Sequence, residues 1–354
     1  MVISYKCPGC GAALSYKEGT DVLKCEYCDT EVSIKALKEI EEEKSQNSQE
    51  EFHAEREKVV REDAVENFKA FHCESCGAEI MTDDHTAATF CGFCGNPALV
   101  EERLVGEKRP AILIPFKINK QQAIEKYRSW TKQGILTPRE FSSTQILEKV
   151  TGMYVPYWLY DYDANVSMGA HGTKVNVTRK GDTEYIYTRH YDIQRNITAE
   201  FNKVPQDASE KMVDSVMEQI EPFDYKEITP FEMPYLSGFF AEKYNYTGEQ
   251  LKPQVEERVS KFATDMARGT INGYSSVNVT YANTNLAEID MVYAMLPVWM
   301  LNYTYKGKNY LLTMNGQTGK MVGKLPISPL RAFVAWGISS IVLFIILLVI
   351  GGML

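Results

Sequence analysis

Cys7-Pro-Gly-Cys10 and Cys25-Glu-Tyr-Cys28 form the first of two cysteine quartets that decide the fold of the N-terminal part of this chain. The second quartet, Cys73-Glu-Ser-Cys76 with Cys91-Gly-Phe-Cys94, repeats the internal spacing of the first. Every cysteine of the chain belongs to one of them. Two residues between paired cysteines let one tight turn present both sulfurs to an ion, and two such turns complete a tetrahedron. The sequence therefore predicts two zinc ribbons.

Each quartet predicts a structural metal site, because four thiolates close the coordination shell and leave no position for water or substrate. We expect two Zn²⁺ ions per chain. A module of about 30 residues has too small a core to fold alone, and metal binding can supply roughly 10–16 kcal/mol. Iron of the rubredoxin type and redox chemistry at one cysteine pair remain alternatives. The predicted ligands are Cys7, Cys10, Cys25, Cys28, Cys73, Cys76, Cys91 and Cys94.

The overall charge argues against broad attraction to nucleic acid. The net charge is −9, and charged residues make up 24% of the chain. Residues 71–100 hold no Lys or Arg, whereas affinity for DNA or RNA depends on cations placed on phosphates. The first residues lack the apolar core of a secretory signal, so we expect the cysteines to stay in the reducing cytosol.

The organisation predicted for the rest of the chain is multidomain α+β. Ribbon 1 occupies residues 1–32 and ribbon 2 occupies 71–100. Residues 33–70 contain no Gly or Pro and many Glu and Lys, which predicts a solvated helical linker, with a coiled coil as the alternative. Residues 109–325 carry most of the Tyr and Trp and predict a β-rich α+β domain.

Within 109–325 the pattern predicts particular elements. Asn119 suits an N-cap, with Gln122 three residues on, so we expect a helix through about Lys132. Other predicted elements are a strand over 155–166, a hairpin turning at 180–182, helices over 209–220 and 248–268, and a hairpin over 309–322 with Asn315-Gly316 as its turn signal.

One aromatic segment occurs twice in this domain. Pro156-Tyr-Trp158-Leu-Tyr-Asp-Tyr162 resembles Pro297-Val-Trp299-Met-Leu-Asn-Tyr303. The resemblance indicates two related halves, and chance similarity between aromatic strands is the alternative.

The stretch from Ala332 to Leu354 carries no charge and is mostly apolar. Its length matches the ~20 residues needed to cross a bilayer, so it predicts a C-terminal transmembrane helix over 332–354. A buried core helix is the alternative. Lys320, Lys324 and Arg331 precede the stretch, which predicts a single-pass protein of the cell membrane with its N-terminal bulk in the cytoplasm.

The two quartets resemble zinc ribbons of the rubredoxin-like class, as in transcription factor IIB and the bacterial primosomal helicase. The whole chain resembles a family of bacterial double-zinc-ribbon, C-terminally anchored proteins, often labelled zinc-ribbon or helicase-like. That resemblance rests on the quartets, Val155-Pro-Tyr-Trp158-Leu-Tyr160, Asn315-Gly-Gln-Thr-Gly319 and the tail. It implies partners of the flotillin-like or phage-shock type in envelope stress.

These observations predict a non-enzymatic, tail-anchored membrane adaptor that binds protein partners through its ribbons and its α+β domain. No His-Glu-x-x-His or Gly-x-Ser-x-Gly motif occurs, so no catalytic or cofactor-binding residues are predicted beyond the metal ligands. Two other functions remain open: a membrane-tethered nucleic-acid-binding factor, and an enzyme of unknown type within 109–325.

Overall fold

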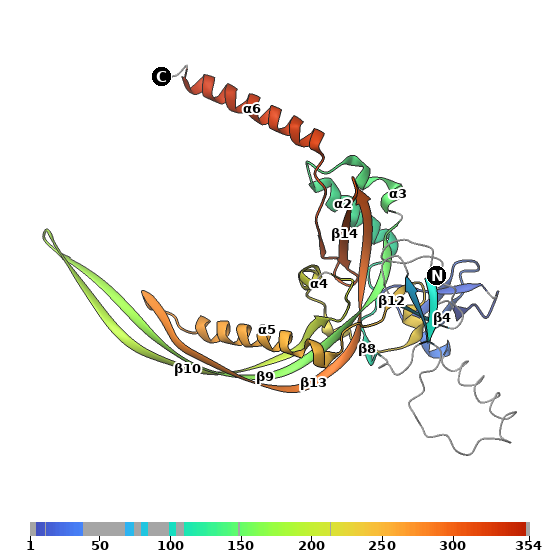
Figure 1. Ribbon diagram of the computed structural model, residues 1–354, viewed down its shortest axis with the longest axis horizontal. Coiled ribbons are helices and arrows are strands. Elements are labelled where there is room, and N and C mark those ends of the chain that lie inside the picture. The colour runs from blue at the N-terminus through green and yellow to red at the C-terminus, as the bar shows by residue number, and fades with distance from the viewer. Residues whose placement is uncertain are drawn as a thin grey trace, which may run out of the picture. The chain divides into compact units, whose positions relative to one another are not determined.

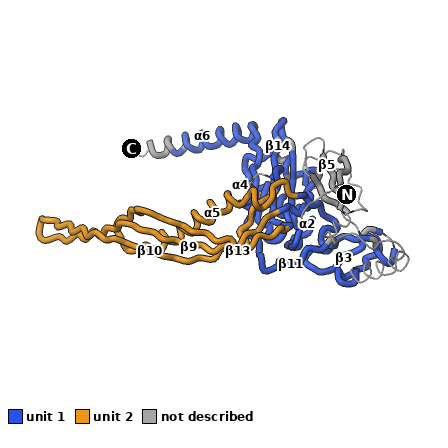
Figure 2. Tube along the Cα trace, turned by 60° about the horizontal axis from the view of Figure 1, so that its bottom comes forward, with its two compact units in different colours: residues 1–156, 209–243, 295–354 blue, residues 157–208, 244–294 orange. Residues whose placement is uncertain are grey.

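The structure is a computed structural model that describes residues 5–10, 12–37, 68–73, 79–83, 99–103, 110–147, 149–212 and 214–351. Most of the predicted helical linker, residues 38–67, lies outside the described residues. The chain forms two compact units (Figure 2). Unit 1 comprises residues 1–156, 209–243 and 295–354, and unit 2 comprises 157–208 and 244–294.

A four-stranded antiparallel sheet opens unit 1, with strand order β1-β2-β3-β4. Its strands are β1 (Tyr5–Lys6), β2 (Ala13–Tyr16), β3 (Val22–Cys25) and β4 (Glu31–Ser33). Leu14 and Leu23 are fully buried on one face of this sheet. The small sheet is the first predicted ribbon.

The larger sheet has the strand order β11-β8-β13-β9-β12-β6-β5-β7, with β10 paired to β9, β14 to β13 and β15 to β14. Its strands are β5 (Phe68–Cys73), β6 (Glu79–Asp83), β7 (Leu99–Arg103), β8 (Ile112–Leu113), β9 (Thr151–Lys180), β10 (Thr183–Asp207), β11 (Thr229–Pro230), β12 (Phe240–Glu242), β13 (Ser276–Tyr305), β14 (Lys308–Asn315) and β15 (Met321–Gly323). The long strands β9 and β13 contribute residues to both units.

The described helices are mostly short, so the protein is a mainly β, α+β protein, as the aromatic-rich sequence predicts (Figure 1). The helices are α2 (Lys120–Gln133), α3 (Thr144–Leu147), α4 (Asp214–Ile220), α5 (Gly248–Gly269) and α6 (Pro329–Gly351), with 3₁₀ turns η1 (Arg139–Ser142), η2 (Tyr225–Glu227) and η3 (Met233–Leu236). The predicted capping box of α2 is present, with Asn119 and Gln122 bonding to each other's backbone N–H.

The core of unit 1 is built on aromatic rings. Phe116 stacks on Phe239 with ring centroids 4.1 Å apart and meets Trp299 edge-on at 5.1 Å. Tyr127 of α2 is fully buried, and its hydroxyl lies 2.8 Å from the carbonyl of Trp299 and 3.1 Å from that of Leu312. Because these two carbonyls belong to β13 and β14, this hydroxyl fixes α2 on the sheet.

The hairpin predicted at 309–322 is confirmed, but its turn differs from the expected one. Strand β14 ends at Asn315 and β15 begins at Met321, with Met314 opposite Met321. Gly319, not Gly316, has the positive φ, 79°. Gly316 instead allows close approach, because a Cβ there would lie 2.6 Å from the Phe116 ring.

Unit 2 consists of a curved three-stranded sheet from β9, β10 and β13, with α5 along one face (Figure 1). The predicted hairpin is present: β9 and β10 pair antiparallel across a turn at Gly181 and Asp182. Alternate residues of β9, including Ala164, Val166 and Met168, are buried in a cluster with α5 residues. The period-2 alternation of the strand meets an apolar stripe of the helix to form this core.

The two repeated segments make the same contact. Trp158 donates its Nε1–H to the carbonyl of Tyr246, directly before the N-cap of α5, at 2.9 Å. Trp299 donates its Nε1–H to the carbonyl of Ile118, directly before the N-cap of α2, at 2.8 Å. Both helices begin with a capping box, and both strands are 30 residues long. This equivalence favours related halves over chance similarity.

The predicted transmembrane helix over 332–354 is wrong. Helix α6 covers most of this stretch, but the described part of the chain contains no helix with the length and apolarity needed to cross a bilayer. The predicted single-pass location in the cell membrane is contradicted by the same finding.

Replacing Tyr127 by Phe removes a buried hydroxyl and leaves carbonyls of β13 and β14 without their donor. We expect Tyr127→Phe to lower the free energy of unfolding by about 1–3 kcal/mol. Urea unfolding followed by circular dichroism measures the change. Tyr246→Phe, at a tyrosine that is 40% exposed, is the control and should change stability by less than about 0.5 kcal/mol. Equal stabilities of the two variants would contradict the assigned role.

Candidate metal centre

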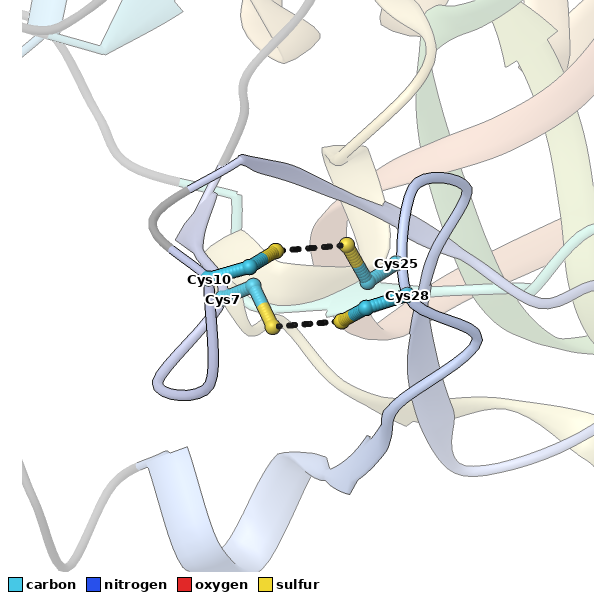
Figure 3. Close-up of side chains that lie close together, drawn as sticks. All are labelled: Cys7, Cys10, Cys25 and Cys28. Atoms are coloured by element: carbon cyan, nitrogen blue, oxygen red, sulfur yellow. Dashed lines mark hydrogen bonds between the residues drawn. The ribbon is translucent and has the colours of Figure 1, made fainter.

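The first quartet lies on two tight turns. Cys7 and Cys10 lie on the turn after β1, and Cys25 and Cys28 lie on the turn at the end of β3. The N–H of Cys7 donates to the carbonyl of Ala12 at 2.7 Å, and the N–H of Cys25 donates to the carbonyl of Thr30 at 2.9 Å. Each bond closes a loop that holds one cysteine pair. Because β1 and β3 both pair with β2, the two loops are brought to the same end of the small sheet (Figure 3).

The four sulfurs converge on a common centre. All four lie within 4.8 Å of one another, and the Cys7–Cys28 and Cys10–Cys25 sulfur pairs are each 3.5 Å apart (Figure 3). Tetrahedral zinc with Zn–S bonds of about 2.3 Å separates its sulfurs by about 3.8 Å. The quartet thus has the donor type, number and spacing to hold a zinc ion.

The burial of the ligands divides the centre into an inner and an outer half. Cys7 and Cys25 are buried, whereas Cys10 and Cys28 are exposed. All four are free thiols. Four thiolates would complete a zinc coordination shell, so the chemistry available to this centre is structural.

Hydrogen bonding lowers the pKa of the outer thiol Cys28. Its sulfur lies 3.0 Å from the Thr30 hydroxyl, and this contact, with the Thr30 backbone, lowers the pKa of Cys28 to about 6. For Cys10 the backbone N–H of Ala12 acts to lower the pKa, but the neighbouring Cys28 sulfur and desolvation outweigh it and raise the pKa to about 12. The Cys28 thiol therefore loses its proton at a lower pH than the Cys10 thiol does. The Cys-x-x-Cys spacing gave no signal for the role of Thr30.

The ribbon is joined to the rest of unit 1 through its second strand. The Ser237 hydroxyl donates to the carbonyl of Leu14 at 2.6 Å, and the N–H of Tyr16 donates to the carbonyl of Ser237 at 2.9 Å. The Tyr16 and Tyr235 rings meet edge to face at 5.2 Å. Folding of the ribbon around a metal is thereby coupled to the packing of η3.

The second quartet is described only in part. The backbone of Cys73 ends β5, whereas Cys76, Cys91 and Cys94 lie outside the described residues. The pair Phe71 and Ile80 on β5 and β6 matches the pair Tyr5 and Leu14 of the first ribbon in register. The described backbone therefore repeats the first ribbon, and a second metal site stays a prediction.

Comparison with known proteins gives one informative relative. No family model and no solved structure matches the chain. A protein of Bacillus subtilis strain 168, described as uncharacterized protein YdjG, is 38% identical over 328 residues. The match covers 93% of this chain and 91% of that protein, so it takes in nearly all of both units. The resemblance to anchored double-ribbon proteins is not confirmed by a family model.

Removing one ligand from each quartet tests the number of metal ions. We expect two zinc ions per chain in the wild type, one in Cys25→Ser and none in the double variant Cys25→Ser/Cys91→Ser, because three thiolates bind zinc far more weakly than four. Inductively coupled plasma mass spectrometry of the purified protein measures the content. Lys17→Ala, which changes an exposed ion pair on the same ribbon, is the control and should keep both ions. Two ions in Cys25→Ser would contradict the assigned ligand set.

Proposed function

This chain belongs to the family of Bacillus subtilis YdjG, and we propose that it is a non-enzymatic adaptor that binds protein partners, with zinc ribbons as structural modules. The convergence of four cysteine sulfurs on one centre carries this proposal. Cys7, Cys10, Cys25 and Cys28 would hold the zinc ion, and its role there is to fold the ribbon. The resemblance to double-ribbon proteins supports a second ion in the other quartet.

The surfaces of the described residues also support binding rather than turnover. Two open grooves have volumes of about 450 and 520 Å³. The first, in unit 2, is lined by uncharged Asn, Ser, Thr, Val and Ile side chains. In the second, in unit 1, Gln317 accepts from the N–H of Asp224 and donates to Glu227, and Lys117 pairs with that same Glu227. The Lys117 and Gln317 side chains of this groove are thus engaged in bonds that hold the fold.

The charge of the first ribbon supports a protein partner over a nucleic acid. The described cations Lys17 and Lys24 are paired with Glu31 and Asp29 in ion pairs of 2.6 and 2.7 Å. Cations that are already paired contribute little to phosphate binding. Flotillin-like and phage-shock-type proteins, implied by the family resemblance, are the first partners to test.

Photo-crosslinking in cells followed by affinity purification of the full chain tests the adaptor proposal. We expect a defined protein to be recovered with the wild type and its yield to fall at least fivefold with Cys25→Ser, because the ribbon depends on its metal. Lys17→Ala is the matched control and should retain the partner. Recovery of nucleic acid without a protein, or equal recovery with Cys25→Ser, would contradict a function that depends on the ribbon.

A further inference from the structure

The end of the β9–β10 hairpin has a face that combines cations with aromatic rings. We call this the tip face and define it by Lys174, Lys180, Tyr185, Tyr187 and Arg189. The register places these side chains on one side of the ribbon, because Lys174 lies opposite Arg189, Asn176 opposite Tyr187, and Thr178 opposite Tyr185. The tip face continues the side of the sheet that α5 covers nearer the core.

Beyond Lys174, which lies against the Tyr191 and Tyr274 rings, nothing among the described residues of unit 2 covers the tip face. The hairpin extends past the end of α5 and the start of β13 (Figure 1). Near the start of β13, hydrogen bonds join Ser275 and Ser276 to Thr173 and Val175 of β9. Tyr185 and Tyr187 are therefore 45% and 57% exposed. A two-stranded ribbon is marginal in water by itself, so its exposed rings indicate a surface that a partner completes.

The charges of the tip face are of one sign. The hairpin end is fully described, and its strand carboxylates, Glu184 and Asp192, lie on the opposite face, with Asp182 in the turn. Lys174 and Arg189 stand directly opposite each other, an arrangement that is destabilising between like charges. Lys174 is held 5.1 Å from the Tyr274 ring and 5.5 Å from the Tyr191 ring. An anionic group bound between Lys174 and Arg189 would relieve their repulsion.

The side chains on the other face of the hairpin end favour a polypeptide over a nucleic acid as the binding partner. Val175, Val177 and Ile186 lie there, 41%, 54% and 64% exposed. Apolar β-branched side chains gain from burial against a protein but offer nothing to a phosphate backbone. Tyr and Arg are also the residues most enriched at the energetic centres of protein interfaces.

From this combination we propose that the tip face is the docking site for an acidic segment of a partner protein, an inference that rests on the proposed adaptor function. Carboxylates of that segment bind Lys174, Lys180 and Arg189, and its apolar side chains pack on Tyr185 and Tyr187. The chain itself has a net charge of −9, so the tip face is a local exception to its overall charge.

Fluorescence anisotropy of a labelled twelve-residue peptide of alternating Glu and Leu tests the site with the full chain. We expect the wild type to bind this peptide and Arg189→Glu to bind it at least about tenfold more weakly. Arg189→Glu places opposite charges across from each other at Lys174, so the hairpin should remain formed, as circular dichroism can check. Lys261→Glu, the same charge change on an exposed residue of α5, is the matched control and should bind as the wild type does.

Three results would overturn the proposal. The first is that the wild type does not bind the acidic peptide, and the second is that Arg189→Glu binds it as tightly as the wild type does. The third is that the wild type binds a single-stranded oligothymidylate more tightly than the peptide, and that Arg189→Glu weakens this binding. The last would identify the tip face as a nucleic-acid site. If a protein partner is crosslinked in cells while Arg189→Glu changes neither its recovery nor peptide binding, the tip face is excluded and the adaptor function stands.

Discussion

The register between β9 and β10 is the constraint on which the architecture of unit 2 depends. Side chains alternate between the faces of a strand, so a slip of one residue would move Ala164, Val166 and Met168 from the core into solvent. The same alternation continues past the end of α5, where no helix of the described part of the chain meets it. There the core face becomes the tip face, and its aromatic rings lie in solvent. One register therefore sets both the core and the exposed surface of this unit.

In unit 1 the main constraint is the convergence of four thiols at the end of a small sheet. Leu14 and Leu23 give the ribbon only a minimal core, and a bound metal would supply most of its folding free energy. The bonds of Ser237 to Leu14 and Tyr16 then tie the ribbon to η3. A metal bound by the quartet would therefore stabilise both the ribbon and its packing against η3.

The two repeated segments each place a tryptophan on a strand where its indole bonds to the start of a helix. In each case an indole N–H donates to the carbonyl directly before the N-cap of a helix. In chain order, the first half contains α2 and β9, and the second half contains α5 and β13. Trp158 of β9 bonds to the start of α5, and Trp299 of β13 bonds to the start of α2. The strand of each half therefore holds the helix of the other half. The two units are thus each built from parts of both halves, and neither half corresponds to a unit.

Local chemistry made much of this protein predictable from its sequence. The Cys-x-x-Cys spacing, the Asn119 capping box and the Gly181 turn are short-range signals, and each gave the element or cluster that the structure contains. Apolarity at 332–354 was also a local signal, but it predicted a membrane span that the described residues do not support. Features that join distant residues gave no local signal: the docking of Ser237 on the ribbon, and the cations that register brings together on the tip face. Only tertiary structure decided these, because strand pairing and packing set which side chains meet across 15 to 223 positions of the chain.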